Sequence, residues 1–87
     1  MKYTEPRPYA DPEKAARRIL EIANSVEPVQ DGRIYVELIN SPFLFELRGS
    51  PEEYGAALKL AIARGWLTLH ESGTFVKFTQ AGADLFV

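Results

Sequence analysis

The chain has 87 residues, of which 46% are hydrophobic and 25% are charged, and its formal net charge is −2. This composition is typical of one globular domain, and the absence of cysteine excludes disulfides and thiolate chemistry. The mild acidity argues against strong autonomous nucleic-acid binding, which usually depends on a basic surface. No apolar run of about 18 residues is present, and the N-terminus lacks the apolar stretch of a signal peptide. We therefore expect a cytoplasmic protein.

Residues 1–10 contain two prolines and little periodicity, so we expect a flexible arm that precedes a single domain over residues 11–87. A first helix is expected after Asp11, which can cap it, with Pro12 in the first turn, where a missing N–H has no cost. Pro28 is expected to stop this helix. Its apolar stripe consists of Ala15, Ile19, Ile22 and Val26, with Ala23 beside it.

The segment 33–48 combines strand-forming and helix-forming patterns. "RIYVELI" is rich in β-branched and aromatic residues, whereas "YVELINSPFLFEL" also fits a short helix broken before Pro42. We expect a short extended segment near 33–35, followed by one or two helical turns between 36 and 46. Six apolar residues can form the second wall of a core: Ile34, Val36, Ile39, Phe43, Leu44 and Leu47.

Residues 51–64 carry the clearest helix signals in the chain. Ser50 can cap this helix, Pro51 suits its first position, and Glu53 completes an S-x-x-E capping box. Gly65 fits the left-handed position that ends many helices. At about 100° per residue, the core-facing stripe consists of Tyr54, Ala57, Leu58, Ala61 and Ile62. The opposite side carries Glu52, Ala56, Lys59 and Ala63, with Leu60 on its flank.

Residues 66–78 are expected to form a β-hairpin, because "WLTLH" and "TFVKF" are rich in strand formers and "ESG" supplies a turn with glycine. The side chains expected to point inward are those of Leu67, Leu69, Val76 and Phe78. Thr79 can cap a short terminal helix, with Leu85 and Phe86 packing back on the core.

The order of these elements resembles the winged-helix variant of the helix-turn-helix. The most similar piece is "ALKLAIARGWLTLHESGTFVKFTQAGADLF", which resembles the passage from helix to wing in small bacterial regulators. The resemblance implies an α+β, mainly α fold, with a three-helix core, a C-terminal two-stranded hairpin as the wing, and a short terminal helix. In DNA-binding members the last helix before the wing enters the major groove. Here that helix is 51–64, and the wing turn is 70–74.

The helix 51–64 differs from a DNA reader in its charges. Glu52 and Glu53 at its start would repel phosphates, although a glutamate can accept a hydrogen bond from cytosine, and "HESGT" in the wing carries no arginine or lysine. The outer side of the helix is apolar enough to permit close approach by another helix. We therefore expect a non-enzymatic interaction or dimerisation module, compatible with a regulatory role. A protein partner or a second copy would contact Ala56, Lys59, Leu60 and Ala63.

The alternative is a transcriptional regulator that binds duplex DNA, and this interpretation depends on the element order alone. The expected contacts would be Arg17, Arg18, Lys59, Arg64 and Lys77. Arg17 or Arg18 can instead pair with Glu21 on a solvated helix face.

The sequence offers little for enzyme chemistry. His70 is the only histidine, and a metal site needs about three protein ligands. Ser72 and Thr74 beside it lack the wider constellation that activates a nucleophile. The glycines do not follow a phosphate-binding spacing. We expect no catalysis, no metal or other cofactor, no small-molecule substrate and no membrane partner.

Overall fold

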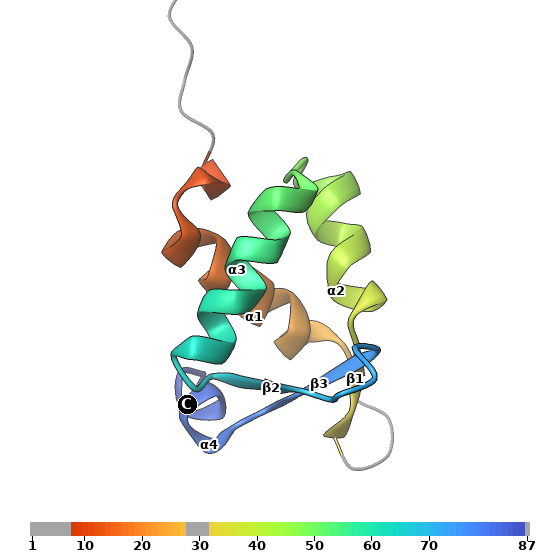
Figure 1. Cartoon of the computed structure of the whole chain (residues 1–87), viewed down its shortest axis with the longest axis vertical. Helices are drawn as coiled ribbons and strands as arrows, with labels where there is room; N and C mark the ends of the chain where they lie inside the picture. Colours follow the sequence, from red (N-terminus) through yellow and green to blue (C-terminus); the bar gives the residue numbers. More distant parts are fainter. Residues whose placement is uncertain (1–7, 28–31, 87) are drawn as a thin grey trace, which may run out of the picture.

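The computed structural model describes residues 8–27 and 32–86. In these residues the α-helices are α1 (Pro12–Ser25), α2 (Glu37–Ser41), α3 (Pro51–Ala63) and α4 (Gln80–Asp84). Pro8–Ala10 form a short 3-10 helix, η1, and Pro42–Glu46 form a π-helix, η3. The strands β1 (Ile34–Tyr35), β2 (Leu67–Leu69) and β3 (Phe75–Phe78) make an antiparallel sheet in the order β1-β3-β2. Figure 1 shows α1, α2 and α3 grouped on one side of this sheet. The predicted α+β, mainly helical class is confirmed.

The helix α1 begins as the sequence predicts, because Asp11 Oδ1 accepts the N–H of Glu13 at 2.9 Å. It ends at Ser25, and Pro28, the expected stop, lies outside the described residues. The buried face is wider than the predicted stripe and consists of Ala15, Ala16, Ile19, Leu20, Ile22 and Ala23. This helix packs most extensively against α3. Fully buried alanines on both helices permit a close approach.

The end of the predicted N-terminal arm, residues 8–10, is part of the folded structure. Residues 1–7 lie outside the described residues, but Pro8–Ala10 form η1. The half-buried ring of Tyr9 lies 5.1 Å from that of Phe43, centroid to centroid. The last residues of the predicted arm are therefore part of the core packing, because an aromatic side chain gains by leaving water.

The ambiguous segment adopts the predicted order of a short strand followed by helical turns. The helix does not break at Pro42 but continues in a wider form, and Leu47 N–H bonds to Pro42 O at 3.0 Å, five residues back. Proline lacks an N–H and crowds the preceding turn, so the wider turn accommodates it. Gly49 follows, and a methyl group there would overlap the Phe43 ring at 2.1 Å. The six predicted core residues of this segment are all buried or half-buried.

The helix α3 has the predicted capping box, with Ser50 Oγ accepting Glu53 N–H at 3.0 Å and Glu53 Oε1 accepting Ser50 N–H at 2.9 Å. Gly65 has φ of 76° and terminates the helix as expected. The buried face is centred on Ala57 and Ala61, and the other three predicted core residues are half-buried. Leu60 is also half-buried and packs against the core.

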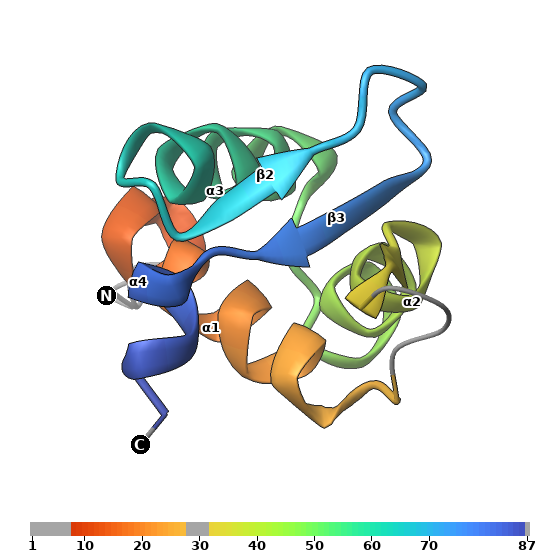
Figure 2. The same ribbon diagram turned by 90° about the horizontal axis from the view of Figure 1, so that it is seen from below.

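The hairpin forms with Leu67 opposite Phe78 and Leu69 opposite Val76. Leu67 and Val76 are buried and Phe78 is half-buried, but Leu69 is 40% exposed. Its predicted inward position is therefore only partly realised. Leu69 is the last residue of β2, and Figure 2 shows that the connection from β2 to β3 extends beyond the helices.

The terminal helix α4 is capped by Thr79, whose Oγ1 accepts the N–H of Gly82 at 3.0 Å. The same hydroxyl donates to the carbonyl of Gly65 and so links the end of α3 to the start of α4. Leu85 and Phe86 pack back less than predicted, since they stay 41% and 38% exposed. A helix of five residues is too short to carry them across the core.

Candidate functional site

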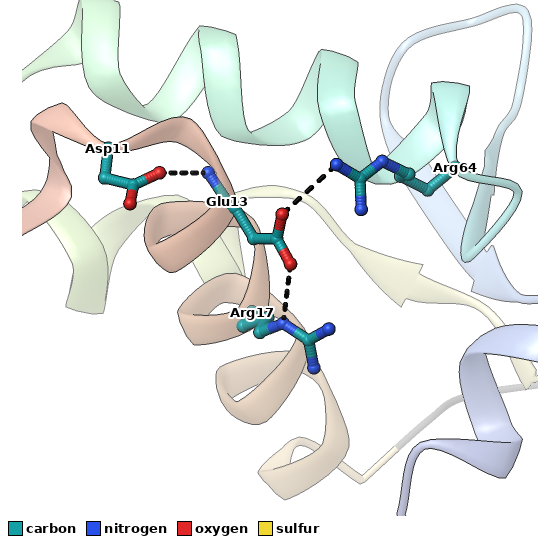
Figure 3. A network of polar contacts seen from close by, with 4 residues as sticks. All are labelled: Asp11, Glu13, Arg17 and Arg64. Carbon is teal, nitrogen blue, oxygen red and sulfur yellow. Dashed lines mark hydrogen bonds and ion pairs between the residues drawn. The ribbon is translucent and has the colours of Figure 1, made fainter.

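Three of the five residues predicted to contact nucleic acid form ion pairs within the chain. Arg17 Nε lies 3.3 Å from one carboxylate oxygen of Glu13, and Arg64 Nη2 lies 3.1 Å from the other (Figure 3). Arg18 Nη1 lies 2.5 Å from Glu21 Oε1, one of the two pairings that the sequence suggested. Part of the positive charge needed for phosphate contacts is therefore already neutralised.

The two arginines that bind Glu13 also cover the indole of Trp66. The guanidinium carbons of Arg17 and Arg64 lie 5.3 and 5.5 Å from the ring centroid, within cation–π range, and Trp66 is 8% exposed. We call Glu13, Arg17, Arg64 and Trp66 the Trp66 cluster. Hydrogen bonds from Arg64, and secondarily from Arg17, lower the pKa of the Glu13 carboxyl. The carboxylate therefore stays ionised and offsets one of the two positive charges.

The other two predicted nucleic-acid contacts lie elsewhere. Lys59 is exposed on α3, and Lys77 is half-buried on β3. The first turn of α3 carries Glu52 and Glu53. Their negative charges interact favourably with the helix dipole, and Glu53 completes the cap, but both carboxylates would repel a phosphate. The structure thus brings Arg17 and Arg64 together around a carboxylate and places Lys77 in a separate hollow.

This hollow has a volume of about 250 Å³ and is lined by residues of β2, β3 and the turn between them, together with Arg33. Phe75 lies in it, with the His70 ring stacked on it at 4.4 Å and the Arg33 guanidinium 4.7 Å from its centroid. We call Arg33, His70, Phe75 and Lys77 the Phe75 cluster; Thr68 and Leu69 complete the lining. No carboxylate contributes to this lining among the described residues. Only Lys77 of this cluster was a predicted site residue.

His70 and Ser72 are close enough to suggest a nucleophile and a base. His70 Nδ1 lies 2.9 Å from Ser72 Oγ, and Ser72 Oγ lies 2.8 Å from Thr74 Oγ1. However, Nδ1 also accepts the backbone N–H of Ser72 at 3.1 Å, and Gly73 has φ of 77° in the same turn. These bonds hold the wing turn, and no carboxylate orients the imidazole among the described contacts. The arrangement is explained as turn structure rather than catalysis.

The predicted protein-contact surface on α3 is only partly free. Ala56, Lys59 and Ala63 are exposed, whereas Leu60 packs on the core. Without Leu60, the exposed part of this surface is two methyl groups and a lysine. It offers little apolar area to a partner.

The most exposed of the large hydrophobic side chains in the described residues lies on η3. Phe45 is 78% exposed, and Leu38, seven residues earlier along the same helical segment, is 45% exposed. Pro42 lies between them, four residues after Leu38 and three residues before Phe45. We call Leu38, Pro42 and Phe45 the α2–η3 face. The sequence reading missed this face, although apolar residues on all sides of the segment 36–47 were a usable signal.

A groove of about 350 Å³ lies beside this face, between α1 and the α2–η3 segment. Its apolar lining comes from Ile22, Val26, Leu38, Pro42 and Leu47, and its polar lining from Arg18, Glu21, Ser25 and Glu46. Leu38 and Pro42 belong to both the face and the groove. Phe45 itself does not line the groove, but its neighbour Glu46 does. The exposed aromatic side chain therefore lies on the helical segment that forms one wall of the groove.

The described residues contain no cluster of three or more potential metal-ligating His, Cys, Asp or Glu side chains. In the same residues, none of the helices has the length and apolar character needed to cross a membrane. Comparisons with protein families, curated proteins and solved structures gave no match to this chain.

Proposed function

We propose that this chain is a small non-enzymatic interaction module that pairs with a second copy of itself through the α2–η3 face. The observation that carries the proposal is the 78% exposure of Phe45 on the segment whose Pro42 and Glu46 line an apolar groove. Burying one such side chain contributes about 1.5–3 kcal/mol relative to leaving it in water. A solvent-exposed phenylalanine next to a hollow of suitable size favours an interface over a bare surface.

A winged-helix scaffold is part of the proposal. The element order α1-β1-α2-α3-β2-β3 and the sheet order β1-β3-β2 support it. In this arrangement the short strand before α2 pairs with the second strand of the hairpin, with Ile34 opposite Val76. The pairing ties the segment before α2 to the wing and so fixes where the α2–η3 face points.

We infer a second copy as the partner because the projecting side chain and one wall of the groove belong to the same helical segment. In a twofold dimer each patch meets its own equivalent, so Phe45 of each copy can enter the groove of the other. The groove has a volume of about 350 Å³. An aromatic side chain that enters such a groove buries about 150–250 Å² of its surface. The rim is mixed in charge, with Arg18, Glu21 and Glu46 around the groove, so a copy brings a cation and carboxylates to the same rim.

The test is the mass of the protein over a range of concentrations by analytical ultracentrifugation. We expect the wild type to dimerise as concentration rises and Phe45→Glu to stay monomeric, because the variant would place a carboxylate in an apolar groove. Phe45 is largely exposed, so the folded monomer should tolerate this change. Ala56→Glu, on the exposed side of α3, is the matched control and should still dimerise.

Two results would overturn the proposal. One is a strictly monomeric wild type at high concentration. The other is a dimer that survives Phe45→Glu but is lost in Ala56→Glu, which would move the interface to the α3 surface of Ala56, Lys59 and Ala63. Leu60→Glu is a poor probe of that surface, because Leu60 packs on the core and its loss would also unfold the domain.

Duplex DNA binding is the competing proposal, and the charge distribution gives it weaker support. Arg17, Arg18 and Arg64 are paired with carboxylates, and α3 begins with two glutamates. Titration with random duplex DNA at low salt favours any phosphate attraction. We expect no binding there. Binding that weakens in both Lys59→Gln and Lys77→Gln would support the DNA alternative instead.

A further inference from the structure

The Phe75 cluster has a defined place in the sheet. Lys77 lies opposite Thr68 on β2, and Ile34 lies opposite Val76 on β1. Extending the β1–β3 register by one residue places Arg33 level with Lys77. Arg33, Lys77 and Thr68 therefore form a row across the sheet on the face that carries Phe75, and all three line the hollow of about 250 Å³.

No ion pair among residues 8–27 and 32–86 compensates the charges in this row. Two cations at the same level of neighbouring strands repel each other, and the ion pairs of the described residues involve Arg17, Arg18 and Arg64 instead. Arg33 Nε is buried and has no hydrogen-bond partner among the described residues. An unmet buried donor is destabilising. An anion in the hollow would relieve the repulsion between Arg33 and Lys77.

The polar groups around the hollow are all able to donate hydrogen bonds. They include the guanidinium of Arg33, the ammonium of Lys77 and the hydroxyl of Thr68. His70 adds a fourth, because its Nδ1 accepts the Ser72 N–H, so a neutral imidazole carries its proton on Nε2. Several donors without a carboxylate make a set suited to phosphate oxygens.

The shape and the overall charge favour a small ligand over a polymer. The Phe75 ring is covered by His70 and Arg33, so it does not offer a free platform on which a base could stack. The chain is acidic overall, at −2, which disfavours the approach of a long polyanion. From this geometry we propose that the hollow binds the phosphate group of a small phosphorylated molecule, held by Arg33, Lys77, Thr68 and His70.

The test is an NMR titration of the ¹⁵N-labelled protein with inorganic phosphate and with a nucleoside monophosphate, at constant ionic strength against chloride. We expect saturable shifts confined to the backbone of Arg33, Thr68, His70 and Lys77. Lys77→Gln should weaken binding by about tenfold or more, since a hydrogen bond to a charged group is lost. Lys59→Gln removes an equal charge from α3 and should leave the affinity unchanged.

The Lys59→Gln control distinguishes a specific phosphate site from general electrostatic attraction of phosphate to the protein. Equal weakening in Lys59→Gln and Lys77→Gln would overturn the proposal, and so would phosphate shifts no larger than those with chloride. A short single-stranded oligonucleotide is the third ligand in the titration. If it binds through Lys77 while phosphate and the monophosphate do not, the hollow serves a polymer and the small-ligand proposal is wrong.

Discussion

The Trp66 cluster and the Phe75 cluster share one kind of contact, an arginine over an aromatic ring, but differ in the charges around it. In each, a buried aromatic ring of the hairpin region is covered by arginine, at 5.3 and 5.5 Å for Trp66 and 4.7 Å for Phe75. Glu13 binds both arginines over Trp66, whereas no carboxylate lines the hollow of Phe75 among the described residues. Over Trp66, the positive charge of the arginines is partly neutralised by Glu13, and the contact is structural. Over Phe75, no lining carboxylate neutralises the charge of Arg33, so this charge is available to a ligand.

The two rings also differ in what they join. Trp66 belongs to the main core cluster and lies where α1, α3 and the start of β2 meet. Phe75 is buried to a similar degree but lies outside that cluster, beneath polar side chains of the sheet and turn. The first ring therefore supports the domain, and the second supports only a surface feature.

The largest expected effect comes from truncating each ring in turn. Trp66→Ala should lower the free energy of unfolding by about 3–5 kcal/mol, the usual cost of deleting a buried aromatic side chain. Phe75→Ala should cost less, because the side chains over it are polar and the surface can relax around the gap. Urea denaturation of the two variants measures both costs. Equal losses would mean that both rings are core and would remove the contrast.

The next effect concerns the backbone beneath the Trp66 cluster. A methyl group on Gly82 would lie 2.1 Å from the carbonyl oxygen of Trp66, so α4 must move to accommodate it. We expect Gly82→Ala to lower the free energy of unfolding by about 1–3 kcal/mol, as overpacking does. Gly55→Ala is the control, because nothing lies within 4 Å of a methyl group there, and helical alanine is favoured over glycine. A stable Gly82→Ala together with an unstable Gly55→Ala would contradict this packing.

The parts of the structure that the sequence predicted are those determined by local chemistry. Asp11, Ser50 with Glu53, and Thr79 cap their helices as expected, since each bond spans only two or three residues. Gly65 ends α3 for the same reason, because only a residue that tolerates positive φ fits there.

The candidate site could not be predicted in the same way, because it depends on residues far apart in the chain. Glu13 and Arg64 are 51 residues apart, and no local pattern indicates that they meet. Arg33 and Lys77 share a hollow only through the β1–β3 register, which a two-residue strand hardly specifies. The packing of Leu60 on the core was not predicted for another reason. The buried face of α3 is centred on two small alanines, which give little periodic hydrophobic signal.

A carboxylate in the Phe75 cluster should make it resemble the Trp66 cluster. Thr68 lies opposite Lys77, so Thr68→Glu creates a cross-strand ion pair that contributes about 0.2–1 kcal/mol. We expect phosphate binding to be lost while stability rises slightly relative to Thr68→Gln, which has the same size without the charge. Thermal unfolding and the phosphate titration measure the two effects. Retained binding in Thr68→Glu would show that the anion does not occupy the hollow.

The reverse change removes the acid from the Trp66 cluster. The pKa of the Glu13 carboxyl is lowered from 4.5 by its hydrogen bonds with Arg64 and Arg17. Folding therefore favours the ionised form, and the stability that this form contributes is present above pH 4.5 and lost as the pH falls through the lower folded pKa. Glu13→Gln has no such carboxyl, so its urea midpoint should fall less steeply than that of the wild type in this acidic window.

The effect on stability should be small, because the Glu13 ion pairs are exposed and screened by solvent. The effect on binding is more informative, since Glu13→Gln leaves Arg17 and Arg64 over Trp66 without an acid, as Arg33 is over Phe75. We expect phosphate to shift the side-chain Nε resonances of Arg17 and Arg64 in this variant but not in the wild type. Glu71→Gln, in the exposed hairpin turn, removes the same charge elsewhere and should not produce these shifts. If Glu13→Gln gains no phosphate binding, then the missing carboxylate is not what separates the two clusters, and the fixed row of donors across the sheet is the feature that matters.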